Sequence, residues 1–459
     1  MHATLVLNVV GLTTELLGPN SPNLSVLAAA GGVRALTPIL PAVTCSVQAT
    51  FTTGLAPRAH GAVANGWYYR DTAEIRFWQQ ANSLISGEKV WDAAKRLDAS
   101  FTCAKLFWWF NMYSSADIAV TPRPLYPADG RKIPDIYAEP AELRAELTER
   151  LGTFPLFRFW GPKADIVSSR WILDCARHIY DTRRPTLALV YLPHLDYNLQ
   201  RLGPSDPRIA RDVREIDALC GELIEHVRKD GTRVVVLSEY GITDVRGAVH
   251  INRVLRQAGL LRVTPELGHE MLDAGASDAF AVADHQVAHV YVRSRDRIPE
   301  VERLLKATDG IETVLHADGK REAGLDHPRS GDLVAISASD RWFTYYHWFD
   351  DDRAPDFART VDIHRKPGYD PVELFIDPKL KVPQLKLARV LAKKTLGFRY
   401  LMDVIPLDAS LVRGSHGRLT DDPRAGPVFL SSEPELLPDG RIHATGIKQL
   451  ILDHLTARV

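Results

Sequence analysis

Three strand-length apolar runs constrain the fold of this chain more than any other feature. They are Thr4–Val10, Thr186–Leu192 and Thr232–Leu237, and each is rich in Val and Leu without polar alternation. A continuous apolar run of this length is typical of a strand that is covered on both faces, as in a parallel α/β sheet. We therefore expect the three runs to lie at the centre of a largely parallel sheet.

Helical patterns lie between these runs. Apolar residues recur at three- and four-residue steps in Asp206–Lys229, and similar patterns occupy Trp171–Tyr180 and Ala141–Leu151. Alternating strands and helices predict an α/β class with a doubly wound core. The 459 residues correspond to about three domains, or to one large domain with inserted lid or cap subdomains.

The chain divides into core segments and two insertions. Residues 81–165 are rich in aromatic residues, Pro and Gly, and form either a packed subdomain core or a lid over a substrate. Residues 261–330 hold a small αβ insertion, with a strand expected over Ala279–Val292 and a helix over Pro299–Ala307. The core then consists of residues 1–80, 166–260 and 331–459.

Charge and cysteine usage narrow the classes of partner and compartment. Lys and Arg number 56 against 57 Asp and Glu, and this balance argues against a nucleic-acid polymer as partner. No uninterrupted apolar run reaches about 18 residues, so we expect no membrane span. The four cysteines show no C-x-x-C spacing, and the N-terminus looks like a first strand rather than a signal peptide. We therefore expect a cytoplasmic protein.

Polar side chains lie at or just beyond the ends of the three apolar runs. Asn8 lies near the end of the first run, Asp196 follows the second, and Glu239 follows the third. Ligands of doubly wound sheets bind beyond the carboxyl ends of the strands. We therefore expect these three side chains to meet at one rim of the sheet.

The segment around Thr44 is the most informative stretch for chemistry. Thr44 follows a loop and precedes a hydroxyl-rich helical pattern that reaches Thr53. A Thr at a helix N-terminus lies near free N–H groups and the positive end of the helix dipole. It can attack phosphorus if a metal or a base activates it. The alternative is that Thr44 only caps the helix.

Three motifs make the chain similar to a known superfamily. They are P-x-x-T ending at Thr44, T-G-L-A-P-R-A-H-G over Thr53–Gly61, and N-G-W-Y over Asn65–Tyr68. Together they resemble the alkaline phosphatase superfamily, near its nucleotide pyrophosphatase/phosphodiesterase and phosphonoacetate hydrolase branches. The resemblance implies an alkaline-phosphatase-like core, with Thr44 as the nucleophile and a phosphothreonine intermediate.

The remaining motifs of the superfamily occur in the expected order, but with altered residues. Asp196 and His416 match the family's metal ligands. At the altered positions, Gln200 and Tyr240 replace His, Glu239 replaces Asp, Val47 replaces Asn, and Val10 replaces the Asp of the first strand, with Asn8 as the nearest polar side chain.

The resemblance implies a divalent metal cofactor, with one or two ions. The predicted ligands are Asn8, Thr44, Asp196, Glu239 and His416, with Gln200 and Tyr240 as further candidates. Zinc prefers imidazole and carboxylate, whereas amide oxygens suit the harder Mg²⁺ or Mn²⁺. The mixed set leaves zinc, manganese and magnesium all open.

Two Asp–His pairs are candidates to complete the metal site. They are Asp284 with His285, and Asp362 with His364, because an Asp near a His is common in ligand and supporting shells. The alternative for both pairs is a structural or surface histidine. We expect His194 to be an ordinary hydrogen-bonded core or rim histidine.

These features together predict a metal-dependent hydrolase of phosphate esters, of the phosphodiesterase or nucleotide pyrophosphatase type. Its substrate would be a small phosphate ester or a nucleotide-like molecule, and Asn65, Trp67 and Tyr68 are predicted to bind it. We expect a monomer or a homodimer. Two alternatives stay open: a catalytically silent protein that binds a phosphorylated metabolite, and a phosphonate hydrolase or phosphotransferase on the same scaffold.

Overall fold

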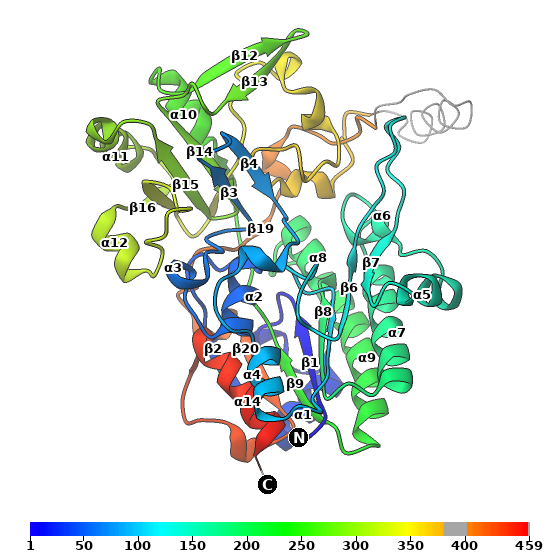
Figure 1. Ribbon diagram of the computed structural model, residues 1–459. Coiled ribbons are helices and arrows are strands. Elements are labelled where there is room, and N and C mark those ends of the chain that lie inside the picture. The colour runs from blue at the N-terminus through cyan, green and yellow to red at the C-terminus, as the bar shows by residue number, and fades with distance from the viewer. Residues whose placement is uncertain (381–401, 458–459) are drawn as a thin grey trace.

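A nine-stranded sheet forms the centre of the molecule (Figure 1). The structure is a computed structural model, and it describes residues 1–380 and 402–457. In spatial order the strands are β21 (Ile442–His443), β2 (Val33–Thr37), β20 (Val428–Ser431), β9 (Arg233–Leu237), β1 (Thr4–Val9), β8 (Leu187–Leu192), β5 (Cys103–Leu106), β6 (Ile118–Pro122) and β7 (Ile136–Glu139).

The three apolar runs are neighbouring parallel strands at the centre of this sheet, as predicted. Strand β1 pairs in parallel with β8 on one side and with β9 on the other, so that Asn8 lies opposite Tyr191 and Leu237. Strands β5 and β6 continue the parallel order, whereas β20 and β7 run antiparallel to their neighbours. The predicted α/β class with a mostly parallel sheet is confirmed.

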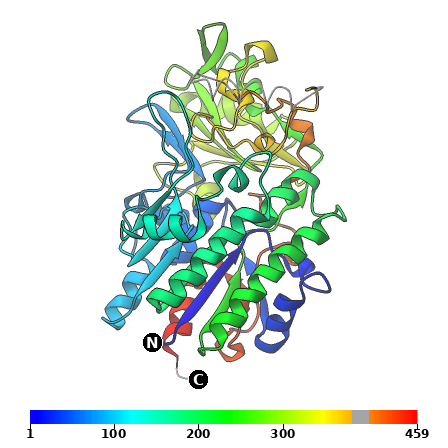
Figure 2. The same ribbon diagram turned by 90° about the vertical axis from the view of Figure 1, so that its right-hand side faces the viewer.

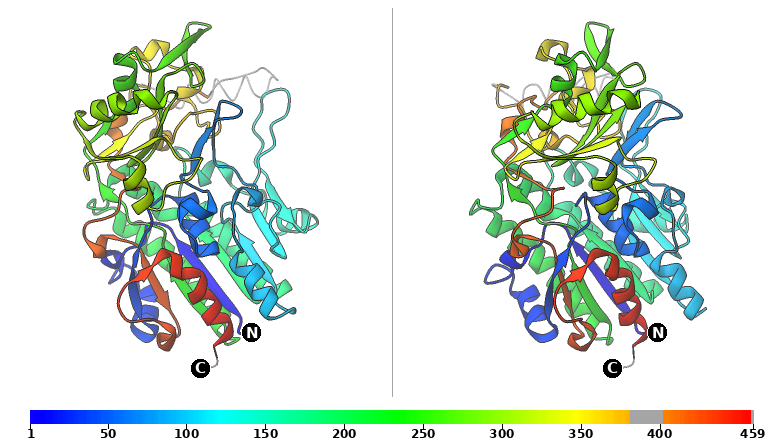
Figure 3. Two further views of the ribbon diagram at one scale, coloured as in Figure 1. Left: turned by 60° about the vertical axis from the view of Figure 1, so that its left-hand side comes forward. Right: turned by 90° about the vertical axis from the view of Figure 1, so that its left-hand side faces the viewer.

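Helices cover both faces of the sheet. On one face α9 (Ile209–Arg228) packs between α7 (Ile166–Arg183) and α1 (Pro22–Gly31), as Figure 2 shows. On the other face α14 (Ile447–Thr456) packs against α2 (Thr44–Thr53) and α4 (Val90–Leu97), and Figure 3 shows α14 beside β1. The remaining helices are α3 (Pro57–His60), α5 (Leu143–Leu151), α6 (Leu156–Phe159), α8 (His194–Leu202), α10 (Ile251–Gln257), α11 (Ile298–Lys306) and α12 (Ala317–Glu322).

The segment 81–165 differs from the expected insertion, because its strands β5, β6 and β7 belong to the central sheet. Phe107 and Trp108 are buried in the main hydrophobic core, which is the packed interpretation of the aromatic stretch. These strands are short and include polar residues such as Lys105, so they give no long apolar run. The predicted limits of the domains stay predictions, and the last segment includes residues 381–401 and 458–459, which lie outside the described residues.

A second, four-stranded antiparallel sheet lies above the rim of the first in Figure 1. It consists of β14 (Ala279–Asp284), β15 (Val287–Val292), β17 (Leu333–Ser337) and β16 (Ile311–Leu315). The single strand expected over Ala279–Val292 is therefore a hairpin, and His285 turns the chain with a φ of 59°. Smaller pairs are β3 (Gly66–Tyr69) with β4 (Glu74–Phe77), β10 (Thr243–Asp244) with β19 (Gly414–Ser415), β11 (Gly247–Val249) with β18 (Arg341–Phe343), and β12 (Arg262–Glu266) with β13 (His269–Asp273).

The first strand and the last described helix lie together at the end opposite the rim, where the His2 N–H donates to the Leu455 carbonyl at 2.8 Å (Figure 3). Among the described residues, none of the helices combines the length and apolar character needed to cross a membrane.

Candidate active site

The rim of the sheet brings together the polar residues that follow its central strands. Asn8 is the penultimate residue of β1, Asp196 lies in the first turn of α8 after β8, and Glu239 follows β9. Thr44 begins α2, which follows β2. All four side chains are buried, and Asn8 and Glu239 are completely so.

Two amides hold the carboxylate of Glu239. Its Oε1 accepts hydrogen bonds from Asn8 Nδ2 at 2.6 Å and from Gln48 Nε2 at 2.5 Å. Burial raises the pKa of Glu239 to about 8, although these hydrogen bonds favour the ionised form. Gln48 was not predicted as a site residue, because its only sequence signal is its position one helical turn after Thr44, on the same face of α2.

A phenol links the predicted nucleophile to the second carboxylate. Tyr240 OH donates to Asp196 Oδ1 at 3.3 Å and lies 3.1 Å from Thr44 Oγ1. Since the phenolic proton points to Asp196, Thr44 is the donor in its hydrogen bond with Tyr240. Burial raises the pKa of Asp196 to about 7. Thr44 is the first helical residue and Val43 is the N-cap, so the alternative role of Thr44 as a cap is not what the structure shows.

Four aromatic rings stack beside this hydrogen-bonded chain. The Tyr240 and His416 rings lie 3.5 Å apart with an interplanar angle of 8°. The ring centroid of His285 lies 3.8 Å from that of His416, and the ring centroid of Tyr369 lies 3.6 Å from that of His285. The hairpin turn of the second sheet therefore delivers His285 into the rim of the first.

Two hydrogen bonds connect the stacked rings to Asp196 through Gln200, which stands where the family has a His. Tyr369 OH donates to Gln200 Oε1 at 2.9 Å, and Gln200 Nε2 donates to Asp196 Oδ2 at 2.7 Å. Both oxygens of Asp196 are therefore hydrogen-bonded, one by a phenol and the other by an amide.

The hydrogen bonds of His416 fix its tautomer. Nδ1 lies 2.8 Å from the Ala42 carbonyl oxygen, so Nδ1 carries the proton and Nε2 carries the lone pair. Burial lowers the pKa of His416 well below its usual value and keeps the ring neutral. Nε2 lies 3.9 Å from Asp196 Oδ1 and has no hydrogen-bond partner among the described residues.

Asp284 supports the start of α2 rather than the rim carboxylates. Its Oδ2 accepts from the Asn65 N–H at 2.7 Å, and its Oδ1 lies 3.1 Å from Asn65 Nδ2 and 2.7 Å from His285 Nδ1. Asn65 Oδ1 in turn accepts from the Cys45 N–H at 2.9 Å. Asp284 thus connects the second sheet to the residue that follows Thr44.

A family model decides the relationship of this chain. The model of the type I phosphodiesterase/nucleotide pyrophosphatase family matches residues 4–370. The chain belongs to this family. The predicted relationship is confirmed, and so, at the level of the family, is the predicted class of phosphoester hydrolases.

Solved structures share the fold of this phosphodiesterase family member. Phosphonoacetate hydrolase of Sinorhizobium meliloti 1021, in complex with phosphonoformate, has a TM-score of 0.64 at 15% identity, over 99% of this chain and 96% of that one. Human ectonucleotide pyrophosphatase/phosphodiesterase 5 has a TM-score of 0.58 at 14% identity, over 100% and 96%. The corresponding murine protein, as an inactive variant in complex with AMP, has a TM-score of 0.57 at 13% identity, over 100% and 96%.

A curated relative matches part of the chain. An uncharacterized pyrophosphatase/phosphodiesterase of Schizosaccharomyces pombe is 26% identical over an alignment of 237 residues, which covers 48% of this chain. The match spans 41% of that relative's length.

The second predicted Asp–His pair lies apart from the rim cluster of this phosphodiesterase family member. The Asp362 N–H donates to Glu373 Oε1 at 2.9 Å, and His364 Nδ1 lies 3.4 Å from the Phe77 carbonyl oxygen. Among the described residues, no hydrogen bond or ion pair joins Asp362 or His364 to Asp196.

The predicted aromatic substrate residues are packed into hydrophobic clusters. Trp67 is 1% exposed and lies under the Arg329 guanidinium at 4.9 Å. Tyr68 packs edge-on against Phe280 and Tyr291. The role of Asn65, Trp67 and Tyr68 in substrate binding stays a prediction, and Asn65 bonds Asp284 and the Cys45 N–H at the start of α2.

The family resemblance implies metal ions at the rim, and the two halves of the rim differ in how well they fit one. In one half Asn8 Oδ1 and Glu239 Oε2 are buried and lack a hydrogen-bond partner among the described residues. These oxygens, with the Thr44 hydroxyl, suit one hard cation such as Mg²⁺ or Mn²⁺. In the other half the amide of Gln200 and the phenol of Tyr240 each donate to the carboxylate of Asp196, which leaves His416 Nε2 as the one predicted ligand atom there without a hydrogen bond among the described residues. A single free imidazole nitrogen beside an already bonded carboxylate does not fit a second ion.

Proposed function

We propose that this protein hydrolyses a small phosphate ester or nucleotide-like diester, with Thr44 as the nucleophile. The observation that carries the proposal is the hydrogen-bonded chain from Thr44 through Tyr240 to Asp196. Membership of the phosphodiesterase family supports the reaction class. The position of Thr44 at the N-terminus of α2 supports binding of an anionic phosphoryl group there, because N–H groups and the helix dipole favour negative charge.

The chain of hydrogen bonds supplies a path for the proton of Thr44. As Thr44 Oγ1 bonds to phosphorus, its proton passes to Tyr240 while the phenolic proton passes to Asp196. A base with a pKa of about 7 is well matched to proton transfer near neutral pH, which fits the raised pKa of Asp196. The bond from phosphorus to the leaving oxygen breaks, and the departing alkoxide takes a proton from water and leaves hydroxide.

Hydrolysis of the phosphothreonine reverses the path. A water oxygen bonds to phosphorus, and the bond from phosphorus to Thr44 Oγ1 breaks. Asp196 returns its proton through Tyr240 to Thr44, and the proton lost by the attacking water neutralises the hydroxide formed in the first step. A cation held by Asn8 and Glu239 would supply Lewis-acid stabilisation of charge on the phosphoryl oxygens.

The relay explains the altered motif in chemical terms. Tyr240 replaces the family's His and cannot serve as the same kind of ligand, yet its hydroxyl accepts from Thr44 and donates to Asp196. Gln200 replaces another His, and its amide fixes the second oxygen of Asp196. In the proposal the two replacements convert a metal half-site into a proton relay.

Three variants test the proposal with bis-p-nitrophenyl phosphate as substrate and Mn²⁺ or Mg²⁺ present. Thr44→Ala should lower kcat by about 1000-fold or more, since it removes the nucleophile. Tyr240→Phe should lower kcat by about 100-fold, since it breaks the proton path. Thr52→Ala is the control, because the Thr52 hydroxyl on the same helix only bonds the Gln48 and Ala49 carbonyls. Full activity of Thr44→Ala would remove the nucleophile from the proposal.

Intact mass spectrometry of quenched reactions gives a second readout. Wild-type protein should gain the mass of the phosphoryl group transferred from the substrate, and digestion of the quenched protein should place that mass on the peptide that contains Thr44. Comparison of nucleotide diesters with phosphonoacetate then separates phosphate-ester from phosphonate cleavage. Turnover of phosphonoacetate alone would move the protein to the phosphonate class.

The burial of the cluster favours a second candidate function. Thr44 is 4% exposed, and its hydroxyl is already bonded to Tyr240. In this closed arrangement the buried hydroxyl, which is already hydrogen-bonded, is not free to attack phosphorus. This is what a catalytically silent protein that only binds a phosphorylated metabolite would show. Calorimetric binding of AMP without turnover of any diester would favour this function.

We also propose a reducing, cytoplasmic location for the protein, which its four free and buried cysteines support.

A further inference from the structure

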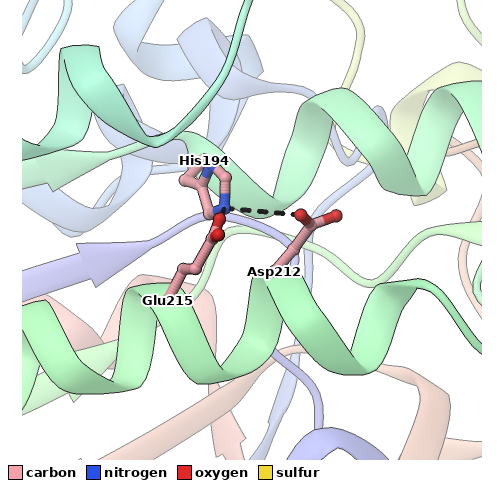
Figure 4. A group of neighbouring side chains, drawn as sticks. All are labelled: His194, Asp212 and Glu215. Carbon is pink, nitrogen blue, oxygen red and sulfur yellow. Dashed lines mark ion pairs between the residues drawn. The ribbon is translucent and has the colours of Figure 1, made fainter.

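A second cluster of possible metal ligands lies between α8 and α9, outside the rim cluster (Figure 4). His194 begins α8, and Asp212 and Glu215 face it from α9. His194 Nε2 lies 3.4 Å from Glu215 Oε2 and 3.7 Å from Asp212 Oδ1. Of the His, Cys, Asp and Glu side chains in the described part of the chain, this is the group of three whose ligand atoms all lie within 4.8 Å of one another.

His194 is buried without hydrogen bonds, which corrects the expectation of an ordinary hydrogen-bonded histidine. Its side chain is 2% exposed, and neither ring nitrogen has a hydrogen-bond partner among the described residues. A buried polar group without a partner is destabilising and requires an explanation. In contrast, His178 and His226 contact their carboxylates at 2.6 Å.

The two carboxylates are each held by one oxygen and present the other to His194. Asp212 Oδ2 accepts from Asn198 Nδ2 at 2.7 Å, which leaves Oδ1 toward the imidazole. Glu215 Oε1 accepts from Arg211 Nε at 2.8 Å, which leaves Oε2 toward the imidazole. Supporting hydrogen bonds of this kind orient the ligands of metal ions in proteins.

The separations match the edges of a small coordination polyhedron. Zinc bonds of about 2.0–2.1 Å in tetrahedral geometry place neighbouring ligand atoms roughly 3.3–3.4 Å apart. The distances at His194, 3.4 and 3.7 Å, are near this edge length and longer than a charged hydrogen bond between the same groups. An imidazole with two carboxylates is also a set that zinc favours over Mg²⁺ or Ca²⁺.

We propose that His194, Asp212 and Glu215 bind one divalent transition-metal ion, with zinc as the best fit. Glu215 is 28% exposed, so the fourth position is open to water and gives the ion a path of entry. The ion joins the start of α8 to α9. Because α8 also carries Asp196 and Gln200, this metal site would position the helix that supplies the rim cluster. The proposal does not depend on the proposed hydrolase activity.

Metal binding by the full-length protein tests the site. Protein freed of metal by a chelator is titrated with Co²⁺ and followed by its visible absorption, then with Zn²⁺ in competition. Wild type should bind an ion with an absorption typical of four-coordinate Co²⁺. Asp212→Asn and Glu215→Gln should each weaken this binding by more than about 10-fold, and Asn198→Ala by about 10-fold, since it removes only a supporting contact.

Two controls separate this site from the rest of the chain. Glu222→Gln lies on the same helix and pairs with Arg170, so it should leave the Co²⁺ spectrum and affinity unchanged. Glu239→Gln removes the rim carboxylate and should affect only an ion bound at the rim, so the four-coordinate Co²⁺ absorption that Asp212→Asn weakens should persist in Glu239→Gln. Equal affinity and absorption in wild type, Asp212→Asn and Glu215→Gln would overturn the proposal in favour of an ion pair.

Crystallography gives an answer even if a variant does not fold. Wild-type crystals soaked with Zn²⁺ are measured on both sides of the zinc absorption edge. An anomalous peak between the three side chains is expected, whereas a soaked crystal without a peak at His194 would overturn the proposal.

Discussion

At the scale of single residues, His60 shows how the motif around the nucleophile depends on a neutral imidazole. The Ala62 N–H donates to His60 Nδ1 at 3.0 Å, so Nε2 carries the proton and donates to Thr50 Oγ1 at 2.9 Å. A second proton on Nδ1 would break the bond to Ala62. Burial, with Arg329 and His327 nearby, lowers the pKa of His60 to about 3.

This arrangement predicts a loss of stability in acid. The unfolded chain takes up a proton at His60 below about pH 6.5, whereas the folded chain does not until about pH 3. The folded pKa is lowered, so stability falls as the pH drops through this window, by about 2 kcal/mol between pH 6.5 and 5. Urea unfolding of His60→Gln should lack this part of the slope, while Thr52→Ala should keep it. Equal slopes for wild type and His60→Gln would contradict the prediction.

The site residues that strand ends supply were predictable, and those that tertiary contacts supply were not. Asp196 and Glu239 follow apolar runs and Asn8 lies near the end of one, and that pattern alone places them at one rim. Gln48 and Tyr369 carry no such signal, because Gln48 depends on the orientation of α2 and Tyr369 reaches the rim from a loop far along the sequence.

At the scale of elements, Asp217 caps a helix to which it does not belong. Helix α1 begins at Pro22, and its N-cap residue makes no side-chain capping bond. Asp217 of α9 accepts instead from the Leu24 N–H at 2.8 Å and from the Asn23 N–H at 3.1 Å. Its carboxylate lies 1% exposed between the two helices and therefore fixes α1 against α9.

Removal of this cap should lower the stability of the protein more than a substitution on the exposed face of α9 does. Asp217→Ala leaves the buried Leu24 N–H and the partly buried Asn23 N–H without their acceptor and should cost about 1–3 kcal/mol of unfolding free energy. Asp217→Asn keeps one acceptor oxygen and should cost less. Glu225→Ala, whose side chain is 76% exposed on the same helix, should change stability by less than about 0.5 kcal/mol. Denaturant midpoints measure all three, and equal shifts for Asp217→Ala and Glu225→Ala would refute the cap.

Element type was easier to predict than element limits. The helix predicted over Asp206–Lys229 is α9, Ile209–Arg228. It was predictable because its apolar residues recur at three- and four-residue steps along one face. The run Ala279–Val292 is interrupted by Asp284, His285 and Gln286, which form the hairpin turn. These three polar residues are buried and include none of the Gly or Asn-Gly signals of a tight hairpin turn, so the pattern did not reveal it.

At the scale of the whole molecule, hydrogen bonds connect the second sheet to the start of α2, the helix that packs on the central sheet. The turn of β14 and β15 places Asp284 against the Asn65 backbone, and Asn65 bonds the Cys45 N–H. The Gln286 N–H also donates to the His416 carbonyl at 2.9 Å. A change in the second sheet should therefore reach the residue next to the proposed nucleophile.

Amide hydrogen exchange can follow this connection. Asp284→Ala removes the acceptor of the Asn65 N–H, so exchange at Asn65 should rise strongly. Exchange at Cys45 should rise as well, by a smaller factor, because Asn65 loses the hydrogen bonds of both its backbone N–H and its side-chain Nδ2 to Asp284. Exchange at Leu5–Leu7 in β1 should not change, because those amides belong to the central ladder. Asp278→Ala, at the far end of β14, removes a surface pair with Arg297 and should leave Cys45 unchanged. If Asp284→Ala alters Asn65 but leaves Cys45 protected, the second sheet supports its own turn only, and the start of α2 is held independently of it.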